Sequence, residues 1–288
     1  MRPRSEGMRF DGVLLASDYD GTLAGSGGIS DDVKRAIRFF IAGGGRFTVC
    51  TGRTRPGFHA YSPEIINAPV LLANGGTAYD YARERVAVDN GIGDEGLEPL
   101  RAVQRRFPDV CIEMYSLERG YALNLSPQSE HHFTSQGIPF DAVDTPEQAP
   151  RPWSKAMMSG TRESIARVQA FLRERWPQIA FLPTDGRFLE VMKRGVDKGT
   201  ALLGLADALG VSHEHVYAVG DGYNDVEMLR AARMGFVPAN GDAFALAAAD
   251  RVVRSNEEGA VAHVIEILSG MYPEGGEEGE TSEATGCV

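Results

Sequence analysis

Short, largely apolar runs recur in the first part of the chain, and each ends at a cluster of polar residues. The first ends at Asp18, the second at Thr51 and the third at Asn74. Runs this short and apolar predict strands that are buried on both faces, as in a parallel sheet. Between the first two runs, a helical pattern with one apolar face begins at Ser30 and stops at three glycines. The predicted elements are strands at 13–17, 46–50 and 70–73 and a helix at 30–42.

The same alternation of strands and helices returns in the last third of the chain. A polar segment, Gly220–Asp225, again follows a buried strand there. This alternation is typical of a doubly wound α/β domain, in which ligands bind beyond the carboxyl ends of the strands. The predicted strands are 216–219, 235–237 and 251–253, and the predicted helices are 198–209, 225–232 and 259–268.

The middle of the chain has a different pattern, with more alternation of apolar and polar residues and closer spacing. This pattern favours an antiparallel sheet with helices on one face. The predicted strands are 85–88, 110–115, 121–125, 156–159 and 179–182, and the predicted helices are 95–106, 129–136 and 162–175. We therefore predict an α/β protein: a Rossmann-like doubly wound parallel-sheet core at 8–84 and 187–272, with an inserted α+β cap domain at 85–186.

Composition limits the partners of this protein. The chain has 288 residues, a formal net charge of −11 and three widely spaced cysteines. An acidic protein argues against nucleic acid as a partner, whereas local cations and a metal can still hold a small phosphorylated substrate. No apolar stretch is long enough for a signal-peptide core or a membrane span, so we expect a cytoplasmic monomer or homodimer without a membrane partner. Residues 273–288 contain five Glu and are expected to form a disordered acidic tail.

The polar clusters at the strand ends contain the groups that phosphoryl transfer requires. Asp18 and Asp20 lie two residues apart, and carboxylates this close repel one another unless a cation lies between them. Oxygen ligands favour Mg²⁺, and a carboxylate neutralised by a metal can attack phosphorus. Thr51 offers a hydroxyl group to a phosphate, and Lys198 offers a compact positive charge at the start of a helix. The segment Gly220–Asp225 supplies further carboxylates.

Four motifs in this order resemble those of the haloacid dehalogenase superfamily of phosphatases. They are DxDGTL at 18–23, TGR at 51–53, the lysine of GVDKG at 195–199 and GDxxND at 220–225. Asn-Gly-Gly at 74–76, followed by a large insert, resembles the Cof-type, class IIB branch of that superfamily. One Asp-Gly motif alone would often be a plain turn, but four motifs in order, each at a strand end or helix start, are specific. The resemblance implies a Rossmann-like catalytic core with an inserted cap.

The resemblance also implies how the reaction proceeds. Asp18 would be the nucleophile, and Asp20 would protonate the leaving oxygen and then activate water. Thr51 and the N–H group of Gly52 would hold the phosphoryl oxygens, while Lys198 would neutralise the charge of the nucleophile and of the phosphoryl group. The implied enzyme is a Mg²⁺-dependent phosphatase that hydrolyses small organic phosphate monoesters, with sugar phosphates favoured, through an aspartyl-phosphate intermediate.

Further residues are assigned to the metal and the substrate by the same resemblance. Asn224 would assist Lys198, and Asn74 is expected at the substrate site. Arg53 either contacts the substrate or pairs with a carboxylate of the core. The implied Mg²⁺ ligands are Asp18, Asp20 through its backbone carbonyl, Asp221, and Asp225 directly or through water.

Some alternatives stay open from the sequence alone. A phosphotransferase or phosphomutase of the phosphomannomutase type would use the same core, and residues 18–23 also resemble trehalose- or sucrose-phosphate phosphatases. A non-catalytic binding module would lack a motif residue, but every motif position is filled. We interpret the adjacent His131 and His132 as part of a solvated cap surface, because neighbouring side chains on a helix point apart. The physiological substrate, the cap residues that select it and the roles of Tyr19 and Asn240 are left open.

Overall fold

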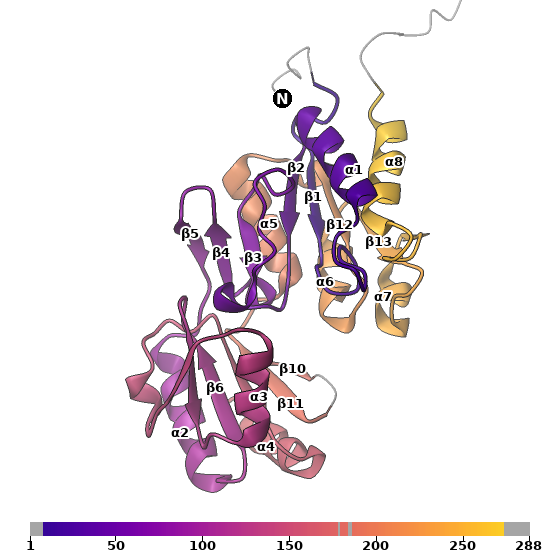
Figure 1. Cartoon of the computed structure of the whole chain (residues 1–288). Helices are drawn as coiled ribbons and strands as arrows, with labels where there is room; N and C mark the ends of the chain where they lie inside the picture. Colours follow the sequence, from indigo (N-terminus) through magenta and orange to yellow (C-terminus); the bar gives the residue numbers. More distant parts are fainter. Residues whose placement is uncertain (1–7, 178, 184–185, 274–288) are drawn as a thin grey trace, which may run out of the picture.

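The computed structural model describes residues 8–177, 179–183 and 186–273. Figure 1 shows two lobes, one built around β1, β2 and β12 and the other around β6, β10 and β11. The first lobe contains both the beginning and the end of the described chain, and the second is formed by its middle. The predicted acidic tail, apart from Pro273, lies outside the described residues.

A five-stranded parallel sheet forms the centre of the first lobe. Its strand order is β14-β13-β12-β1-β2, and each neighbouring pair runs parallel. The carboxyl ends of β1 and β12 therefore lie side by side at one edge of the sheet. The strands are β1 (Leu14–Ser17), β2 (Arg46–Val49), β12 (Val216–Val219), β13 (Met234–Pro238) and β14 (Arg251–Val253).

Helices cover both faces of this sheet. On one face α1 and α8 pack against Leu15 and Phe47, and on the other α5 and α6 pack against Leu14 and Ala16. Because every residue of β1 is buried, both of its faces must be covered by apolar elements. The helices of this lobe are α1 (Asp31–Ala42), α5 (Lys198–Leu209), α6 (Val226–Ala231), α7 (Ala243–Ala248) and α8 (Ala260–Met271). The predicted doubly wound core is confirmed.

A small antiparallel sheet stands beside the parallel one and corrects one prediction. It consists of β3 (Val70–Leu72), β4 (Thr77–Asp80) and β5 (Arg85–Asp89). We predicted that the strand beginning at Arg85 belongs to the cap, but it pairs with β4 across a short turn. The chain reverses there through Glu84, which has a left-handed φ of 49°. A local hairpin therefore holds this strand with the core.

The second lobe contains a six-stranded sheet, whose extent corrects the other predicted limit of the cap. Its order is β10-β11-β9-β6-β7-β8, and all pairs are antiparallel except β7 with β8. We placed residues from 187 onward in the core, but β11 pairs with β9 and β10 because its Leu189 and Val191 belong to the apolar core of this lobe. The strands are β6 (Cys111–Tyr115), β7 (Gly120–Leu123), β8 (Phe140–Ala142), β9 (Lys155–Ser159), β10 (Ala180–Pro183) and β11 (Phe188–Met192).

Helices cover both faces of the cap sheet, whereas we expected them on one face. Ile112 and Met114 of β6 pack with α2 and α4, while Cys111 and Tyr115 pack with Phe133 of α3. All five residues of β6 are buried, so a single layer of helices would have left one face in water. The helices are α2 (Leu97–Arg106), α3 (Pro127–Ser135) and α4 (Arg162–Arg175).

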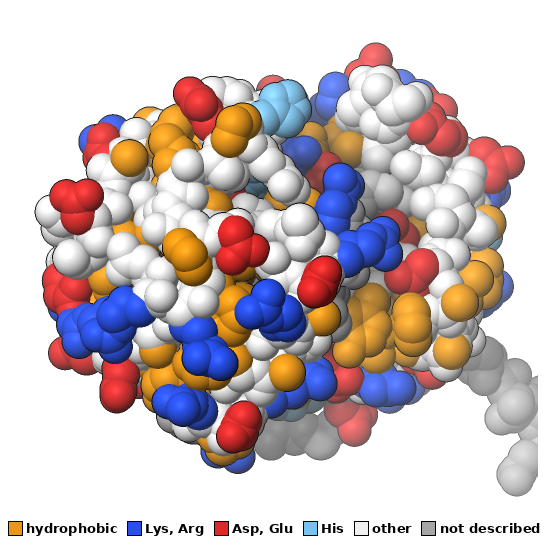
Figure 2. All heavy atoms as spheres, turned by 90° about the horizontal axis from the view of Figure 1, so that it is seen from below, with side chains coloured by type: hydrophobic (Ala, Val, Ile, Leu, Met, Phe, Trp, Pro, Cys, Tyr) orange, Lys and Arg blue, Asp and Glu red, His pale blue; other side chains and the backbone are white. Residues whose placement is uncertain are grey.

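Two further observations concern the charge on the surface and the character of the helices. Seen from below, the molecule carries basic and acidic side chains interspersed with hydrophobic ones, so the charge on this face is mixed (Figure 2). Among the helices of the described residues, none combines the length and the apolar character that crossing a bilayer requires.

Candidate active site

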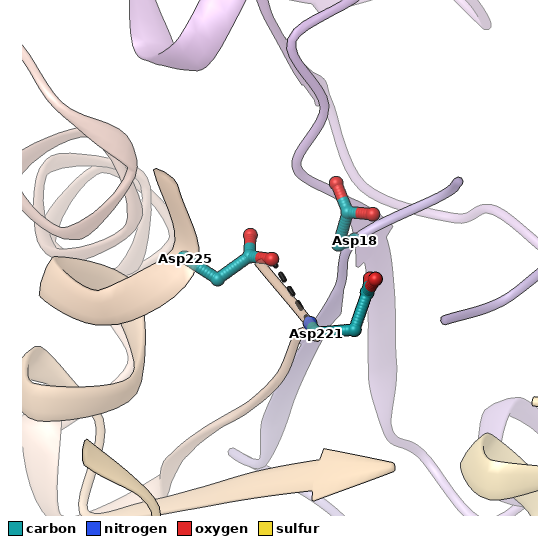
Figure 3. Close-up of side chains that lie close together, drawn as sticks. All are labelled: Asp18, Asp221 and Asp225. Carbon is teal, nitrogen blue, oxygen red and sulfur yellow. Dashed lines mark hydrogen bonds between the residues drawn. The ribbon is translucent and has the colours of Figure 1, made fainter. Parts of the chain in front are cut away.

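Three carboxylates meet where the parallel strands β1 and β12 end. Asp18 follows β1, and its backbone N–H donates to the carbonyl oxygen of Val219 at the end of β12, at 2.9 Å. Asp221 follows β12, and Asp225 comes from the 3₁₀ turn that precedes α6. Figure 3 shows the three side chains converging from these segments. One oxygen atom from each carboxylate lies within 4.8 Å of the others.

The turn after Asp18 is shaped by close packing against Asp221. Gly21 has a left-handed φ of 84°, and a Cβ atom there would overlap the carboxylate of Asp221. Thr22 Oγ1 donates to Asp221 Oδ1 at 2.5 Å. Asn240, whose role the sequence left open, donates to the carbonyl oxygen of Gly21 at 2.9 Å and accepts from the N–H of Asn256 at 2.9 Å. Asn240 thus ties this turn to the loop after β14.

Lys198 lies between two of these carboxylates. Its Nζ donates to Asp18 Oδ1 and to Asp225 Oδ1, each at 2.6 Å, and the residue is fully buried. Burial alone would lower the pKa of Lys198, but the charges of Asp18 and Asp225 outweigh it and raise the pKa above its ordinary value. The side chain is therefore a fixed ammonium group. It begins α5, whose N-cap residue Asp197 accepts from the N–H of Thr200 at 2.8 Å.

The three carboxylates of the site carry more negative charge than Lys198 neutralises. Burial raises the pKa of Asp18 from 3.8 to about 7, Lys198 opposes that rise, and Asp225 and Asp221 add to it. Burial also raises the pKa of Asp221, with Asp225 contributing and the Thr22 hydroxyl opposing. One ammonium group therefore does not balance three carboxylates that are this close together.

The donor set fits a hard divalent cation. Carboxylate oxygens are the ligands that Mg²⁺ favours, and a cation would relieve the repulsion among these groups. Asp225 Oδ2 accepts from the N–H groups of Asp221 and Gly222 at 3.0 and 2.9 Å, and its Oδ1 accepts from Lys198. Asp18 and Asp221 are thus better placed for direct coordination than Asp225. The side chain of Asp20 lies outside the acidic triad, and the expected role of its backbone carbonyl stays a prediction.

Thr51, Asn74 and Asn224 form another side of the site. Thr51 is buried two residues after the end of β2, and its Oγ1 accepts from the N–H of Arg53 at 3.1 Å. Asn74 has a left-handed φ of 54° and accepts from Asn224 Nδ2 at 3.0 Å. Its own Nδ2 donates to Glu190 of β11 in the cap, at 2.8 Å. The structure therefore brings Thr51, Gly52, Asn74 and Asn224 to the cleft that holds the acidic triad.

Arg53 pairs with a core carboxylate, which is one of the two alternatives left open by the sequence. Its Nε and Nη2 donate to the two oxygens of Asp20 at 2.8 and 2.7 Å. The guanidinium group also lies over the ring of Tyr19, 5.0 Å from its centre. Tyr19 packs edge-on against Phe58 as well, so it supports the position of Arg53 beside the site.

The cleft has a volume of about 570 Å³, and the cap provides its opposite wall. Sequence reasoning did not identify these cap residues. Lys155 of β9 donates to the carbonyl oxygen of Gly52 at 2.9 Å and to Glu190 Oε1 at 2.7 Å. A lysine at the start of a largely apolar strand was the available signal, since such a residue is rarely buried without a partner. The cap residues that line the cleft are His132, Gln136, Lys155, Leu182 and Glu190.

The interpretation of His132 as part of a solvated surface was wrong. Its side chain is 21% exposed, and Nδ1 lies 2.8 Å from Glu113 Oε2. Only His131 faces solvent among the two, because adjacent side chains on α3 point in different directions and His132 points into the lobe. A buried glutamate on the neighbouring strand, far away in the sequence, gave no local signal for this pair.

A family model described as haloacid dehalogenase-like hydrolase matches residues 15–265 of the chain. The protein belongs to this family. The family match and the arrangement of sheets together confirm the predicted hydrolase class and the predicted core with an added cap. The motif residues Asp18, Thr51 and Asp221 line one cleft, and the buried Lys198 contacts Asp18 there.

Named relatives and solved structures each match nearly the whole length of this chain. A Haemophilus influenzae protein, provisionally named a phosphatase, is 27% identical over 255 residues, which cover 87% of this chain and 95% of the relative. A Bacillus subtilis relative, named 5-amino-6-(5-phospho-D-ribitylamino)uracil phosphatase, is 25% identical over 90% of this chain and 99% of its own. A haloacid dehalogenase-like hydrolase from Bacteroides thetaiotaomicron superposes with a TM-score of 0.79 at 26% identity, covering 89% of this chain and 99% of that structure.

The fold is also shared with a structure described as a subclass IIB sugar phosphatase. That structure has a TM-score of 0.76 and 19% identity, and the match covers 89% of this chain and 99% of the other. At this level of identity the likeness concerns the fold: a parallel-sheet core with a second lobe. The predicted resemblance to the class IIB branch is confirmed at that level.

Proposed function

We propose that this hydrolase is a Mg²⁺-dependent phosphatase that cleaves small organic phosphate monoesters, sugar phosphates in particular, through an aspartyl-phosphate on Asp18. The observation that carries the proposal is the placement of Lys198. Its ammonium group contacts Asp18 and Asp225 at 2.6 Å each, beside a third carboxylate, Asp221. Together with a divalent cation at the three carboxylates, such a cluster would have the charges needed to hold a dianionic phosphoryl group against a carboxylate nucleophile.

In the first step an oxygen of Asp18 attacks phosphorus, and the bond between phosphorus and the leaving oxygen breaks. Asp20 gives its proton to that oxygen, so the product leaves as a neutral alcohol. In the structure both oxygens of Asp20 accept from Arg53, so this pair must open before Asp20 can deliver a proton. Thr51 and the N–H of Gly52 hold the phosphoryl oxygens, and Lys198 offsets their charge.

In the second step Asp20 removes a proton from water, which attacks the phosphorus of the aspartyl-phosphate. The bond between phosphorus and Asp18 breaks, which regenerates the carboxylate and releases inorganic phosphate. When bound, Mg²⁺ supplies charge neutralisation for the nucleophile and the phosphoryl oxygens. Asp18, Asp221 and the Asp20 carbonyl would hold it, with Asp225 acting through water because both of its oxygens already accept hydrogen bonds.

The relatives support the substrate class. One is named for a phosphate ester of a ribityl compound, and a structure of similar fold is described as a sugar phosphatase. The cleft is large enough for a small phosphorylated molecule, and the cap wall can exclude bulk water from it.

The test is phosphate release from a panel of sugar and other small phosphates, with Mg²⁺ and with EDTA. We expect release only with Mg²⁺, and a fall of roughly 10⁴-fold or more in kcat for Asp18→Asn, because the nucleophile is lost. Asp32→Asn, at an exposed position of α1, is the matched control and should behave as the native protein.

Two results would contradict the proposal. One is full activity of Asp18→Asn, which would exclude this residue as the nucleophile. The other is transfer of the phosphoryl group to an added sugar acceptor without release of phosphate, which would indicate a phosphotransferase.

A further inference from the structure

The cleft offers little unpaired positive charge to a second anionic group on a substrate. The two Lys and Arg side chains that line it in the described part of the chain already have carboxylate partners, Arg53 with Asp20 and Lys155 with Glu190. The fully buried Lys198 is likewise paired, with Asp18 and Asp225. The lining also contains Asp221 and Asp242. A phosphate can still bind with a divalent cation at the acidic triad, but a further carboxylate or phosphate on the leaving group would meet a negative field.

The cap wall offers neutral hydrogen-bonding groups instead. His132 and Gln136 lie one turn apart on and just after α3, and both line the cleft. His132 Nδ1 lies 2.8 Å from Glu113 Oε2, and its Nε2 lies 2.6 Å from Gln136 Nε2. A carboxylate only accepts, so Nδ1 carries the hydrogen and donates to Glu113, and Nε2 accepts from the amide of Gln136.

Glu113 fixes the orientation of the His132 ring. It lies on β6, is fully buried, and also accepts from the hydroxyl group of Tyr115. Burial and the charge of Glu113 raise the pKa of Tyr115 well above its usual value, so the hydroxyl keeps its hydrogen. Glu113 Oε1 has no hydrogen-bond partner within the described residues. A buried, partly unsatisfied carboxylate is costly, and packing of β6 alone would be served better by an apolar side chain.

We propose that His132 and Gln136 recognise hydroxyl groups of the leaving alcohol, and that Glu113 is the positioning residue for His132. A hydroxyl group between them would accept from the Gln136 amide and donate to His132 Nε2, replacing their present contact. The preferred substrates are then monophosphates whose remaining groups are neutral hydroxyls, as in sugar and alditol phosphates. This inference rests on the proposed phosphatase function.

The experiment compares kcat/KM for aldose and alditol monophosphates of three to six carbons with kcat/KM for p-nitrophenyl phosphate, which lacks those hydroxyls. In His132→Ala we expect the best hydroxylated substrate to lose about ten- to a hundredfold relative to p-nitrophenyl phosphate, mainly through KM. Gln136→Ala, at a partly exposed position, should shift the same ratio in the same direction. His131→Ala is the control and should leave the ratio as in the native enzyme.

Glu113 is tested by rescue. Glu113→Gln keeps an oxygen that accepts from Nδ1–H, so most of the native ratio should remain. Glu113→Leu removes that acceptor, so the ratio should fall as in His132→Ala. Circular dichroism of both variants separates these effects from loss of the fold.

The proposed function and this inference fail in different ways. If the native enzyme with Mg²⁺ hydrolyses neither p-nitrophenyl phosphate nor the panel, the phosphatase proposal fails. If it is active but His132→Ala and Gln136→Ala keep the native ratio, the recognition proposal is overturned. A preference of the native enzyme for 2-phosphoglycolate over every hydroxylated probe would overturn it as well.

Discussion

Lys198 holds two buried carboxylates, Asp18 and Asp225, with one ammonium group. A buried ion pair contributes little to stability on balance, because desolvation offsets the attraction. Stability alone therefore gives no reason to place a lysine here. Removing one partner of such a cluster is costly, however, since the remaining charges stay buried without compensation.

Lys198→Met should therefore damage both the fold and the reaction. We expect the free energy of unfolding to fall by about 3–5 kcal/mol and kcat to fall by roughly 10²–10³-fold. Urea denaturation and phosphate release measure the two effects. Lys34→Met, which breaks an exposed pair with Asp31, should change stability by no more than about 0.5 kcal/mol. Near-native turnover in Lys198→Met would argue against a role of this ammonium group at the phosphoryl site.

The residues that sequence reasoning found and those it missed differ in how they are specified. Asp18, Thr51 and Lys198 follow local patterns, because each stands at a strand end or a helix start. Lys155 and His132 depend on partners that are distant in the sequence, Gly52 for the first and Glu113 for the second. No local spacing encodes such contacts, so the wall of the cleft contributed by the cap could not be predicted.

Helices α1 and α5 of the core both begin after a side chain that caps the backbone. Ser30 accepts from the N–H of Val33 at the start of α1, and Asp197 accepts from the N–H of Thr200 at the start of α5. Each cap satisfies a backbone donor that has no partner within its helix. Of these two helices, α5 carries a residue of the site, Lys198, in its first position, and α1 does not.

Replacing the two caps should therefore separate stability from function. Ser30→Ala and Asp197→Ala should each lower the free energy of unfolding by about 1 kcal/mol. Asp197→Ala should also lower kcat, because the first turn of α5 positions the ammonium group of Lys198. Urea denaturation and kcat, measured on the same preparations, test this. An equal loss of kcat in Ser30→Ala would show that the effect is not specific to α5.

Elements were predictable where the pattern was local and repeated. Helix α1 begins after Ser30 as expected, and the core strands lie within a residue or two of the predicted ranges. The sheet that β5 joins was harder to predict, because an isolated strand pattern does not say which sheet it belongs to, and β11 was not predicted as a strand. Strand β5 joins the small core sheet through a hairpin with β4. Strand β11 joins the cap sheet by pairing with β9, with which it shares an apolar core.

At the scale of the whole molecule, the acidic triad links folding to pH and to metal. Without metal, the pKa of Asp18 is about 7 in the folded chain against 3.8 for an ordinary aspartate. The folded state then binds more protons than the unfolded state between these values. The contribution of Asp18 to stability is therefore present at low pH and is lost as the pH rises from about 4 to 7. A bound cation favours the ionised carboxylate and opposes this loss.

The stabilisation by Mg²⁺ should consequently grow with pH. We expect the increase in Tm on adding Mg²⁺ to be larger at pH 8 than at pH 5, because Asp18 must be ionised to bind it. Differential scanning calorimetry in Mg²⁺ and in EDTA at both pH values measures this. In Asp18→Asn the difference between the two pH values should shrink. An increase of equal size at both pH values in the native protein would contradict the linkage.

The order of strands has a consequence for how the chain is completed on the ribosome. β1 lies between β2 and β12, so one of its two partners is synthesised about two hundred residues after it. All six strands of the cap sheet, in contrast, lie within residues 111–192. A nascent chain that has emerged as far as residue 192 can therefore finish the cap while β1 still has an open edge. Protection of that edge by a chaperone until β12 emerges would matter most during this interval.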